Sequence, residues 1–464
     1  MAASRGQWSG KLGFILAASG SAVGLGNLWK FPYITFENHG GAFVLVYLAA
    51  VVLVGMPIMI AEIILGRRSQ LSPVGAFRKL ADGVRGGKAW MGVGFLGVAA
   101  GFVILSYYSI VAGWTLRYTW MALNGQLGAL ARQPGTLDAF FGNYAANGPA
   151  QILGNGLFML LTVGGVYFGV KSGIERVARV LMPILVLILV ALAIYSTTTA
   201  GFGKALAFLF RPNFHELTTH SILEAVGHAF FTLSLGMGAI LTYGSYMGKK
   251  ESIPLAGVAI AVIDTIIAIL ACIVMFSIIF TFDMDVSKSA GILFTTVPTV
   301  FYKMAGGSWI AASFYILVAF AALTSTISLL EVVSSYAIDE LRWSRHQATF
   351  TMGAAIFVFG LLNALSLGAN RTLSTASLLG KSHAGIFNTL DYLASNWMLP
   401  VGGLFIAVFT GWVMSSRDTW DEIRQGSEGG RALFDVWRVL IRFTAPIAVG
   451  AIIFSIIFLG MEYQ

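Results

Sequence analysis

Charged residues are scarce in this sequence. Only 11% of its 464 residues are Asp, Glu, Lys or Arg, whereas an ordinary soluble chain has about 25%. So few charges cannot cover a water-exposed surface, which excludes an ordinary soluble protein. Cysteine is almost absent as well. The single Cys272 lies in an apolar run, which excludes an intramolecular disulfide and a cysteine-based metal site.

Hydrophobic residues make up 57% of the chain instead. A transmembrane helix needs about 20 largely apolar residues, and about eleven segments meet this requirement. We therefore predict an all-α polytopic membrane protein. Residues 281–307 contain Asp283, Asp285 and Pro298 and are predicted to form a short external hairpin. The predicted helices cover residues 12–35, 41–65, 90–122, 151–170, 177–197, 221–245, 254–280, 308–337, 347–366, 386–413 and 440–460.

The basic residues indicate how the chain is oriented. Most of the 29 Lys and Arg residues fall in loops on one side if the N-terminus is cytoplasmic. This bias explains the net charge of +8 without nucleic-acid binding. An odd number of helices places the C-terminus outside. With no linker that resembles a soluble domain boundary, we predict one transmembrane domain, residues 1–464, in the inner (cytoplasmic) membrane of a bacterium.

Glycine clusters interrupt two of the predicted helices. Gly20, Gly24 and Gly26 lie within the first helix, and Gly236 and Gly238 lie within the sixth. Unwound backbone is tolerated at membrane depth only where it lines a cavity or is buried in protein, although either cluster alone could serve close helix packing. Because the clusters occupy corresponding positions, we predict a 5+5 inverted repeat with broken helices 1 and 6 and a ligand site between them. The predicted repeats cover residues 8–200 and 218–413, followed by an extra helix at 440–460.

The first helix also carries a family signature. It consists of Trp8, the run 20–27 (GSAVGLGN), Phe31-Pro32, Glu37-Asn38 and Gly41-Ala42-Phe43. These motifs resemble those of the neurotransmitter:sodium symporters, and the likeness runs through almost the whole chain. It is nearest to the bacterial multi-hydrophobic amino-acid transporters. The resemblance implies sodium-coupled import of hydrophobic L-amino acids such as leucine, isoleucine, phenylalanine and tryptophan by alternating access.

The resemblance further implies two Na⁺ ions bound by oxygen atoms alone, as a hard cation requires. Without the resemblance, the hydroxyls of residues 324–326 could simply hydrogen-bond to their own helix. The first implied site uses the Ala22 carbonyl, Asn27, Thr232, Asp264 and the substrate carboxylate. The second implied site uses the carbonyls of Gly20, Val23 and Ala321 and the hydroxyls of Thr324 and Ser325.

Asp264 is the most informative single residue. It lies in the apolar run AIAVIDTIIAIL without a basic neighbour, and an unpaired carboxylate at that depth is costly. It could be a protonated structural carboxyl, but we favour a cation ligand. Chloride-dependent family members have an uncharged side chain here, so chloride is not expected to be required. His228 replaces the usual glutamine and is either a satisfied polar residue or a group that tunes ion or proton coupling.

The substrate pocket is also carried over from the resemblance. Tyr108 matches the hydroxyl that binds the substrate carboxylate. Gly24 stands where the amine-selective branch has an aspartate, which favours amino acids over amines. The implied substrate residues are Ala22, Gly24, Leu25, Gly26, Ile104, Tyr108, Phe231, Thr232, Ser234, Met237, Ser325 and Leu329.

Gates are predicted on both sides of this pocket. Tyr108 and Phe231 would form the thin outer lid. Outside them, Lys30 replaces the common arginine, and Asp391 is the candidate acidic partner. The cytoplasmic gate would pair Arg5 with Asp339 beside Trp8 and Tyr246. At the start of the fifth helix, Gly173 and Pro183 resemble a bacterial motif that favours local unwinding.

Three other functions are open to a sequence of this kind. A symporter for a small osmolyte would share these sites, and so would a substrate-binding sensor, although the chain lacks a sizeable soluble domain. A membrane enzyme lacks support because no G-x-S-x-G, H-E-x-x-H or P-loop motif occurs. The expected partners are therefore an amino acid, Na⁺ and the bilayer.

Overall fold

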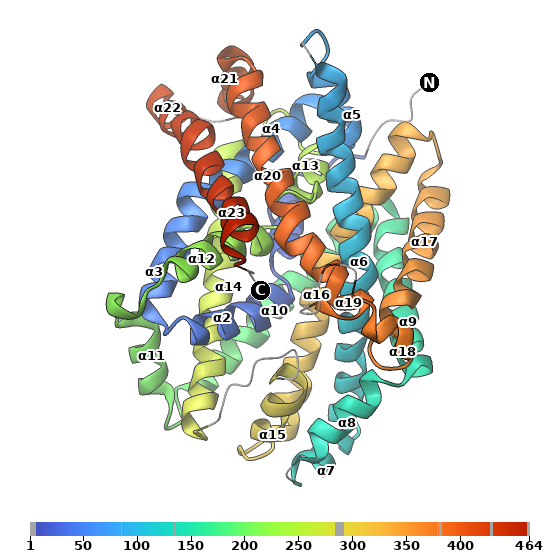
Figure 1. The fold of residues 1–464 in the computed structure, drawn as a ribbon, viewed down its shortest axis with the longest axis vertical. Coiled ribbons are helices and arrows are strands. Elements are labelled where there is room, and N and C mark those ends of the chain that lie inside the picture. Colours follow the sequence, from blue (N-terminus) through green and yellow to red (C-terminus); the bar gives the residue numbers. More distant parts are fainter. Residues whose placement is uncertain are drawn as a thin grey trace.

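The computed structural model describes residues 6–84, 86–133, 135–283, 292–377, 379, 383–426 and 430–461. Within these ranges the chain is a helical bundle without a β-strand (Figure 1). Nine of the described helices are long and apolar enough to cross a membrane, and a bent pair of shorter helices adds a tenth span. The predicted all-α polytopic fold is confirmed.

Most of the long helices follow the predicted spans closely, and several contain a short π-helical stretch, labelled η. The last span begins about nine residues before the predicted 440–460, with α22, and η3 joins α10 ahead of the predicted 177–197. The elements of the spans are α1 (Lys11–Ala22), η1 (Gly26–Lys30), α2 (Phe31–Glu37), α3 (Gly41–Ala50), η2 (Val51–Gly55), α4 (Met56–Ser69), α6 (Gly87–Leu123), α9 (Gly148–Tyr167), η3 (Val170–Ile174), α10 (Glu175–Ser196), α12 (Thr219–Thr232), α13 (Ala239–Gly244), α14 (Ile253–Thr281), α16 (Gly307–Glu340), α17 (Arg345–Leu365), α19 (Ile386–Tyr392), η7 (Leu393–Met398), α20 (Leu399–Val408), η8 (Phe409–Val413), α22 (Arg431–Val439), η9 (Leu440–Thr444) and α23 (Ala445–Leu459).

Both predicted helix breaks are present. The two parts of the first span, α1 and η1–α2, meet at 51°. The predicted span 221–245 is divided into α12 and α13 by residues 233–238. Because α13 has only six residues, it cannot cross a membrane alone. By length and apolarity alone, the described residues contain up to ten spans. The remaining predicted span is the broken α12–α13 segment, which this criterion does not count.

Short helices fill the connections between the spans. They were not predicted, because they are short or amphipathic and lack the long apolar run that marks a membrane span. The predicted hairpin at 281–307 contains one such pair, η5 and α15. The connecting elements are α5 (Pro73–Leu80), α7 (Gln126–Ala131), α8 (Thr136–Ala145), α11 (Phe202–Phe210), the 3₁₀ helix η4 (Phe214–Glu216), η5 (Ile292–Thr296), α15 (Val297–Phe301), α18 (Arg371–Thr375) and α21 (Ser416–Arg424).

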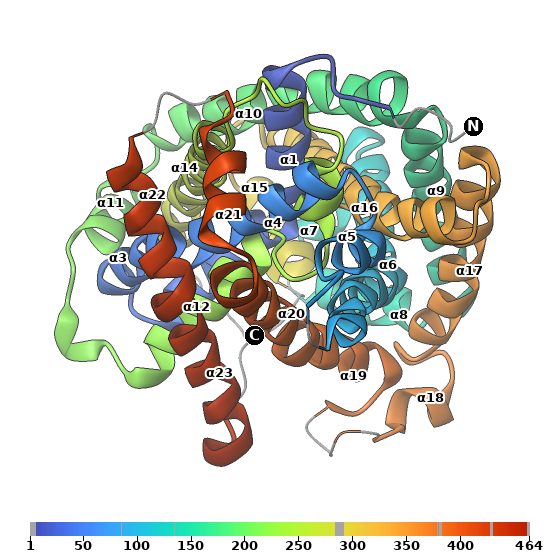
Figure 2. The ribbon, with the colours of Figure 1, turned by 90° about the horizontal axis from the view of Figure 1, so that it is seen from above.

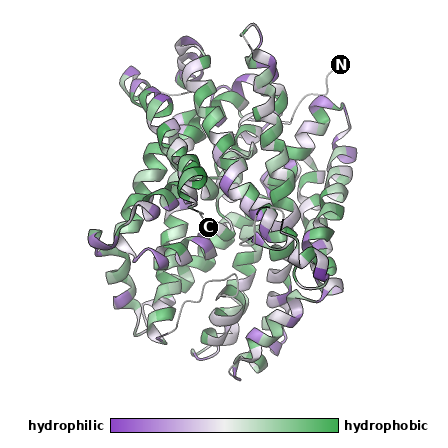
Figure 3. Ribbon diagram, viewed as in Figure 1, coloured by the Kyte–Doolittle hydropathy of each residue, from purple (hydrophilic) through white to green (hydrophobic). Residues whose placement is uncertain are grey.

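The helices form an inner group and a periphery. In the apolar stretch of α16, 83% of the residues are buried, against 28% in the η3–α10 helix. Figure 2 shows α9, α10, α17 and α23 at the edge of the bundle, with α4 and α16 closer to its centre. Hydrophilic residues gather toward the two ends of the bundle, which we call the α21 end and the α8 end (Figure 3). The apolar middle is the part that would face lipid.

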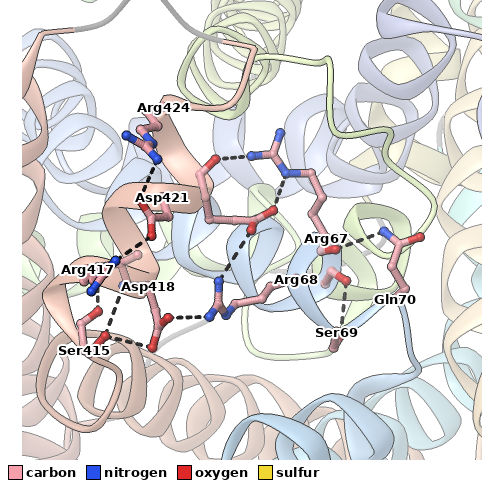
Figure 4. Close-up of polar contacts among 12 residues, drawn as sticks. Arg67, Arg68, Ser69, Gln70, Ser415, Arg417, Asp418, Asp421 and Arg424 are labelled. Carbon is pink, nitrogen blue, oxygen red and sulfur yellow. Dashed lines mark hydrogen bonds and ion pairs between the residues drawn. The ribbon is translucent and has the colours of Figure 1, made fainter.

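Ionic contacts secure the α21 end (Figure 4). The Arg67 guanidinium, at the end of α4, is fully buried and lies 2.7 Å from Glu422 Oε1 on α21. Arg67 also donates hydrogen bonds to the backbone carbonyls of Glu422 and Glu251, and Arg68 pairs with Asp418. A buried arginine needs such a complete set of acceptors. These contacts hold α21 against the end of α4.

Candidate functional site

The first helix break places backbone groups inside the bundle. α1 ends at Ala22, and Val23 is extended with φ −70° and ψ 109°. The Asn27 side chain satisfies one of the backbone N–H groups at the break, because its Oδ1 accepts a hydrogen bond from Gly24 N at 3.0 Å. A Cβ on Gly24 would lie 2.7 Å from Ser325 Oγ and 2.9 Å from Tyr108 Oη. Only glycine fits this position without movement of its neighbours.

The second break lies between α12 and α13. Ser234, Gly236 and Gly238 have φ values of 54°, 78° and 75°, in the left-handed region that favours glycine. The Glu62 carboxylate of α4 accepts hydrogen bonds from Gly236 N at 2.8 Å and Leu241 N at 3.2 Å. Glu62 thus caps the N-terminal end of α13. It was not predicted, although an acidic residue within an apolar span is a usable signal.

The two breaks face each other across a small cavity of about 30 Å³. Ser234 Oγ donates a hydrogen bond to the Ser21 carbonyl at 2.9 Å. Every predicted substrate residue lines the cavity except Leu25, whose backbone N–H donates to Tyr108 Oη at 3.0 Å. Ser21 and Ser328 complete the lining and were not predicted as substrate residues. The lining residues are Ser21, Ala22, Gly24, Gly26, Ile104, Tyr108, Phe231, Thr232, Ser234, Met237, Ser325, Ser328 and Leu329.

An oxygen-rich cluster adjoins the cavity, and its members come from four helices. Asn27 Nδ2 donates to Asp264 Oδ1 at 2.7 Å and to Thr232 Oγ1 at 3.0 Å. Thr232 Oγ1 in turn donates to Asp264 Oδ2 at 3.0 Å, and Tyr47 Oη lies 3.5 Å from the same oxygen. The Asp264 side chain is fully buried. The structure therefore brings together the side chains predicted for the first ion site, beside Ala22 in the cavity wall.

A second oxygen cluster lies where α16 meets α1. Thr324 Oγ1 and Ser325 Oγ donate to the Ala321 carbonyl at 3.0 and 3.2 Å, as expected for helix hydroxyls bonded to their own helix. Ser325 Oγ is also 3.4 Å from the Val23 carbonyl, and a Cβ on Gly20 would lie 3.1 Å from Thr324 Cβ. The residues predicted for the second ion site are thus close together. In the described part of the chain, no three His, Cys, Asp or Glu side chains gather as metal ligands.

His228 lies between aromatic rings near the first cluster. Its ring stacks on Phe31 at 5.3 Å and lies 5.6 Å from the Tyr47 ring, measured between centroids. The imidazole is buried, and neither of its nitrogens has a hydrogen-bond partner among the described residues. Among the described residues, His228 thus packs through its ring faces and makes no side-chain hydrogen bond, and its role stays a prediction.

The predicted cytoplasmic gate residues lie at the α21 end. Trp8 Nε1 donates to the Tyr243 carbonyl at 2.9 Å, and Trp8 N donates to the Tyr246 carbonyl at 3.2 Å. Asp339 Oδ2 accepts a hydrogen bond from Ser72 N at 2.5 Å. Arg5, the predicted partner of Asp339, lies outside the described residues. Near the same end, the predicted unwinding motif is helical, and Pro183 lies inside α10.

An ion pair that was not predicted lies next to these residues. Glu331 on α16 is fully buried and accepts two hydrogen bonds from Arg345 on α17, each of 2.8 Å. Tyr246 Oη donates to Glu331 Oε1 at 2.5 Å. The pair links α13, α16 and α17. A glutamate inside the apolar run of α16 was the signal that could have identified it.

The outer pair differs from the prediction. Among the residues that the structure describes, no ion pair joins Lys30 to Asp391. Instead, Lys30 Nζ lies 4.4 Å from the centroid of the Phe231 ring, and Asp391 is 3.5 Å from Ser395 Oγ. An aromatic face attracts an ammonium group, so the Lys30 ammonium packs against the predicted lid residue Phe231 without a direct ion pair to Asp391.

A helical membrane bundle with facing breaks in two spans has the architecture of inverted-repeat secondary transporters. The model of the sodium:neurotransmitter symporter family matches residues 5–131 and 152–464. The chain belongs to this family. It is therefore a sodium-dependent membrane transporter, not an enzyme.

Individual relatives agree with this assignment. The uncharacterized sodium-dependent transporter YhdH of Bacillus subtilis is 38% identical over 452 residues, which cover 97% of each chain. An uncharacterized sodium-dependent transporter of Haemophilus influenzae is 31% identical over 465 residues and 98% of each chain. The crystal structure of MhsT in complex with L-phenylalanine is 42% identical, with a TM-score of 0.88 over 97% of this chain and 100% of that chain.

Proposed function

We propose that the protein couples Na⁺ entry to the import of hydrophobic L-amino acids such as leucine, isoleucine, phenylalanine and tryptophan. The observation that carries this proposal is the cavity between the two breaks, whose lining is uncharged and which adjoins the carboxylate of Asp264. A net-neutral zwitterion fits such a lining. Its carboxylate would face the Tyr108 hydroxyl and the cation, and its side chain would face Ile104 and Met237. The likeness to MhsT with L-phenylalanine supports an amino-acid substrate.

The pocket must widen to admit such a substrate. A cavity of about 30 Å³ holds about two water molecules, which is less than any hydrophobic amino acid needs. Phe231 and Met237 are the side chains that we expect to move. Phe231 is partly exposed, with the Lys30 ammonium over its ring, and methionine is unbranched and adapts to ligands of different shapes.

Two Na⁺ ions are proposed for the two oxygen clusters. In the first, the Asn27 amide would turn its oxygen toward Asp264 and Thr232, and the Ala22 carbonyl and the substrate carboxylate would complete the shell. In the second, the carbonyls of Gly20, Val23 and Ala321 would join the hydroxyls of Thr324 and Ser325. All of these ligands are hard oxygen donors. Because Asp264 supplies a negative charge, no chloride ion is needed.

The proposed orientation puts the α21 end in the cytoplasm, because Arg67, Arg68 and Arg78 lie there. Relatives from bacteria support the cytoplasmic membrane of a bacterium as its location. We further propose that residues 1–464 form one transport domain. Its repeats, 8–200 and 218–413, would move relative to each other around the fixed site.

Na⁺ and substrate are expected to bind with positive coupling, because the substrate carboxylate completes the first ion site. Leucine should bind at least about fivefold more tightly in Na⁺ than in choline, and Na⁺ should bind more tightly with leucine by the same factor. Scintillation proximity or calorimetric titration of the purified protein at constant ionic strength measures both. Equal leucine affinity in the two salts would refute the proposal.

The protein is expected to accept hydrophobic amino acids of several sizes, because the pocket is apolar and adaptable. Leucine, isoleucine, phenylalanine and tryptophan should compete with one another for uptake. Glutamate and lysine should compete about a hundredfold less well, since a second buried charge would have no partner. Competition against labelled leucine in proteoliposomes gives these values. Strong inhibition by lysine, or by an amine that lacks a carboxylate, would overturn the pocket assignment.

Counterflow of labelled leucine separates transport from sensing. A transporter exchanges external label for internal leucine across the proteoliposome membrane, whereas a sensor binds leucine without exchange. Uptake of a small osmolyte with no competition by leucine would favour the osmolyte symporter instead.

A further inference from the structure

A second cavity lies on the outside of the bundle, near the α8 end. It is a groove of about 510 Å³ between the last third of α6, α8 and the first half of α9. Figure 1 shows α8 packed beside α9 at this end. Two of its wall residues, Leu153 and Leu157, are exposed to 63% and 48%. In a membrane protein, such an exposed apolar wall at the depth of the spans faces lipid.

One cation lies in this apolar groove. The guanidinium of Arg117 on α6 lines it and is partly buried, yet among the described residues Arg117 has no ion-pair or hydrogen-bond partner. No acidic side chain belongs to the described lining; its other polar side chains are those of Asn143, Asn147, Tyr144 and Trp120. An arginine at a lipid-facing surface without a protein acceptor calls for an anionic ligand.

The depth of Arg117 indicates which anion is within reach. Arg117 follows Tyr108, in the wall of the central cavity, by nine residues of α6, which is about 14 Å along a helix. The hydrocarbon core extends about 15 Å from its midplane. The backbone of Arg117 therefore lies near the edge of the hydrocarbon core, from which its long side chain can reach the lipid phosphates. Trp120, one turn farther and 60% exposed, has the interfacial position that tryptophan favours.

We propose that this groove is a binding site for an anionic phospholipid. The lipid phosphate would accept hydrogen bonds from the Arg117 guanidinium, and an acyl chain would lie along Leu153 and Leu157. A zwitterionic lipid brings its own ammonium, which neutralises the phosphate, and the groove offers no carboxylate to bind that ammonium. The orientation proposed above assigns the lipid to the outer leaflet. The site is separate from the substrate cavity, so it does not depend on which amino acid is carried.

Native mass spectrometry of the full-length protein tests this site. The purified protein is equilibrated with equal amounts of phosphatidylglycerol and phosphatidylcholine and then released from detergent. The wild type should retain phosphatidylglycerol in preference to phosphatidylcholine. Arg117→Gln should lower that preference about fivefold, the contribution expected of one arginine near a lipid surface. Leu153→Trp, which fills the apolar wall, should lower retention of both lipids.

Arg132→Gln is the matched control, because Arg132 is an exposed arginine at the end of α7 that does not line the groove. It should behave as the wild type. Leucine-dependent thermal stabilisation shows that each variant is folded. Because it reports on the substrate cavity and not on the groove, it also distinguishes a failure of the lipid proposal from a failure of the proposed transport function. Equal retention of the two lipids by the wild type, or an unchanged preference in Arg117→Gln, would overturn the proposal.

Discussion

Asp264→Asn is expected to weaken Na⁺ binding by about tenfold to a hundredfold. The carboxylate accepts hydrogen bonds from Asn27 and Thr232 within a fully buried cluster. Interactions with a charged group contribute about 1.5–3 kcal/mol, which corresponds to that range in affinity. The substitution also removes the negative charge that balances the cations in a region of low dielectric. We therefore expect uptake by the variant either to fall or to respond to chloride.

Na⁺-driven leucine uptake in proteoliposomes, with chloride or with gluconate as the anion, measures this effect. Wild-type uptake should be the same in both anions. Ser277→Ala is the control, since Ser277 is a buried polar residue of the same helix whose hydroxyl donates to the Ile273 carbonyl, away from the ion cluster. A collapse of wild-type uptake in gluconate would show that Asp264 is not the built-in counter-charge. His228 and Tyr47 would then be the residues to test as chloride ligands.

Loss of the Glu331 carboxylate is expected to destabilise the packed arrangement of the α21 end, the side proposed to be cytoplasmic, by about 3 kcal/mol. Glu331→Ala leaves Arg345 without its bidentate acceptor and Tyr246 without its partner. Breaking a buried pair on one side costs about 3–5 kcal/mol, and the lower value applies because the Arg345 side chain keeps 24% exposure. The α21 end should therefore open more often. Transport should slow because the return to the closed state becomes less favourable.

Cysteine labelling can detect this opening. The native Cys272 is buried, so a Ser245→Cys reporter beside Tyr246 can be labelled against a low background. Its labelling rate should rise about a hundredfold with Glu331→Ala. Glu340→Ala on the same helix breaks a more exposed pair with Arg78 and should change the rate only slightly. An unchanged rate with Glu331→Ala would mean that the pair does not hold this side closed.

The sequence by itself determined the class of fold and the position of the helix breaks. Backbone hydrogen bonds within a membrane must be satisfied locally, so a span is a continuous apolar segment that can be identified without knowledge of its neighbours. Glycines that interrupt such a segment can also be identified from the sequence alone. For this reason the breaks next to Gly24 and at Gly236–Gly238 were predicted at the correct residues.

Much of the candidate site was predicted for a related reason. Polar groups are costly inside a membrane, so Asn27, Thr232 and Asp264 stand out in apolar runs, and the family resemblance related them to one another. The structure brings these three side chains within hydrogen-bond distance.

Only the tertiary structure decided which charged side chains meet. Arg67 and Glu422 are 355 residues apart in sequence, and nothing local to either residue indicates the other. Lys30 was assigned to Asp391 from the sequence, yet its ammonium lies over the Phe231 ring. The acceptor available to a charge depends on how the helices pack around it. Apolarity and backbone breaks are properties of a segment, whereas a charge pair is a property of distances that exist only after the segments have packed.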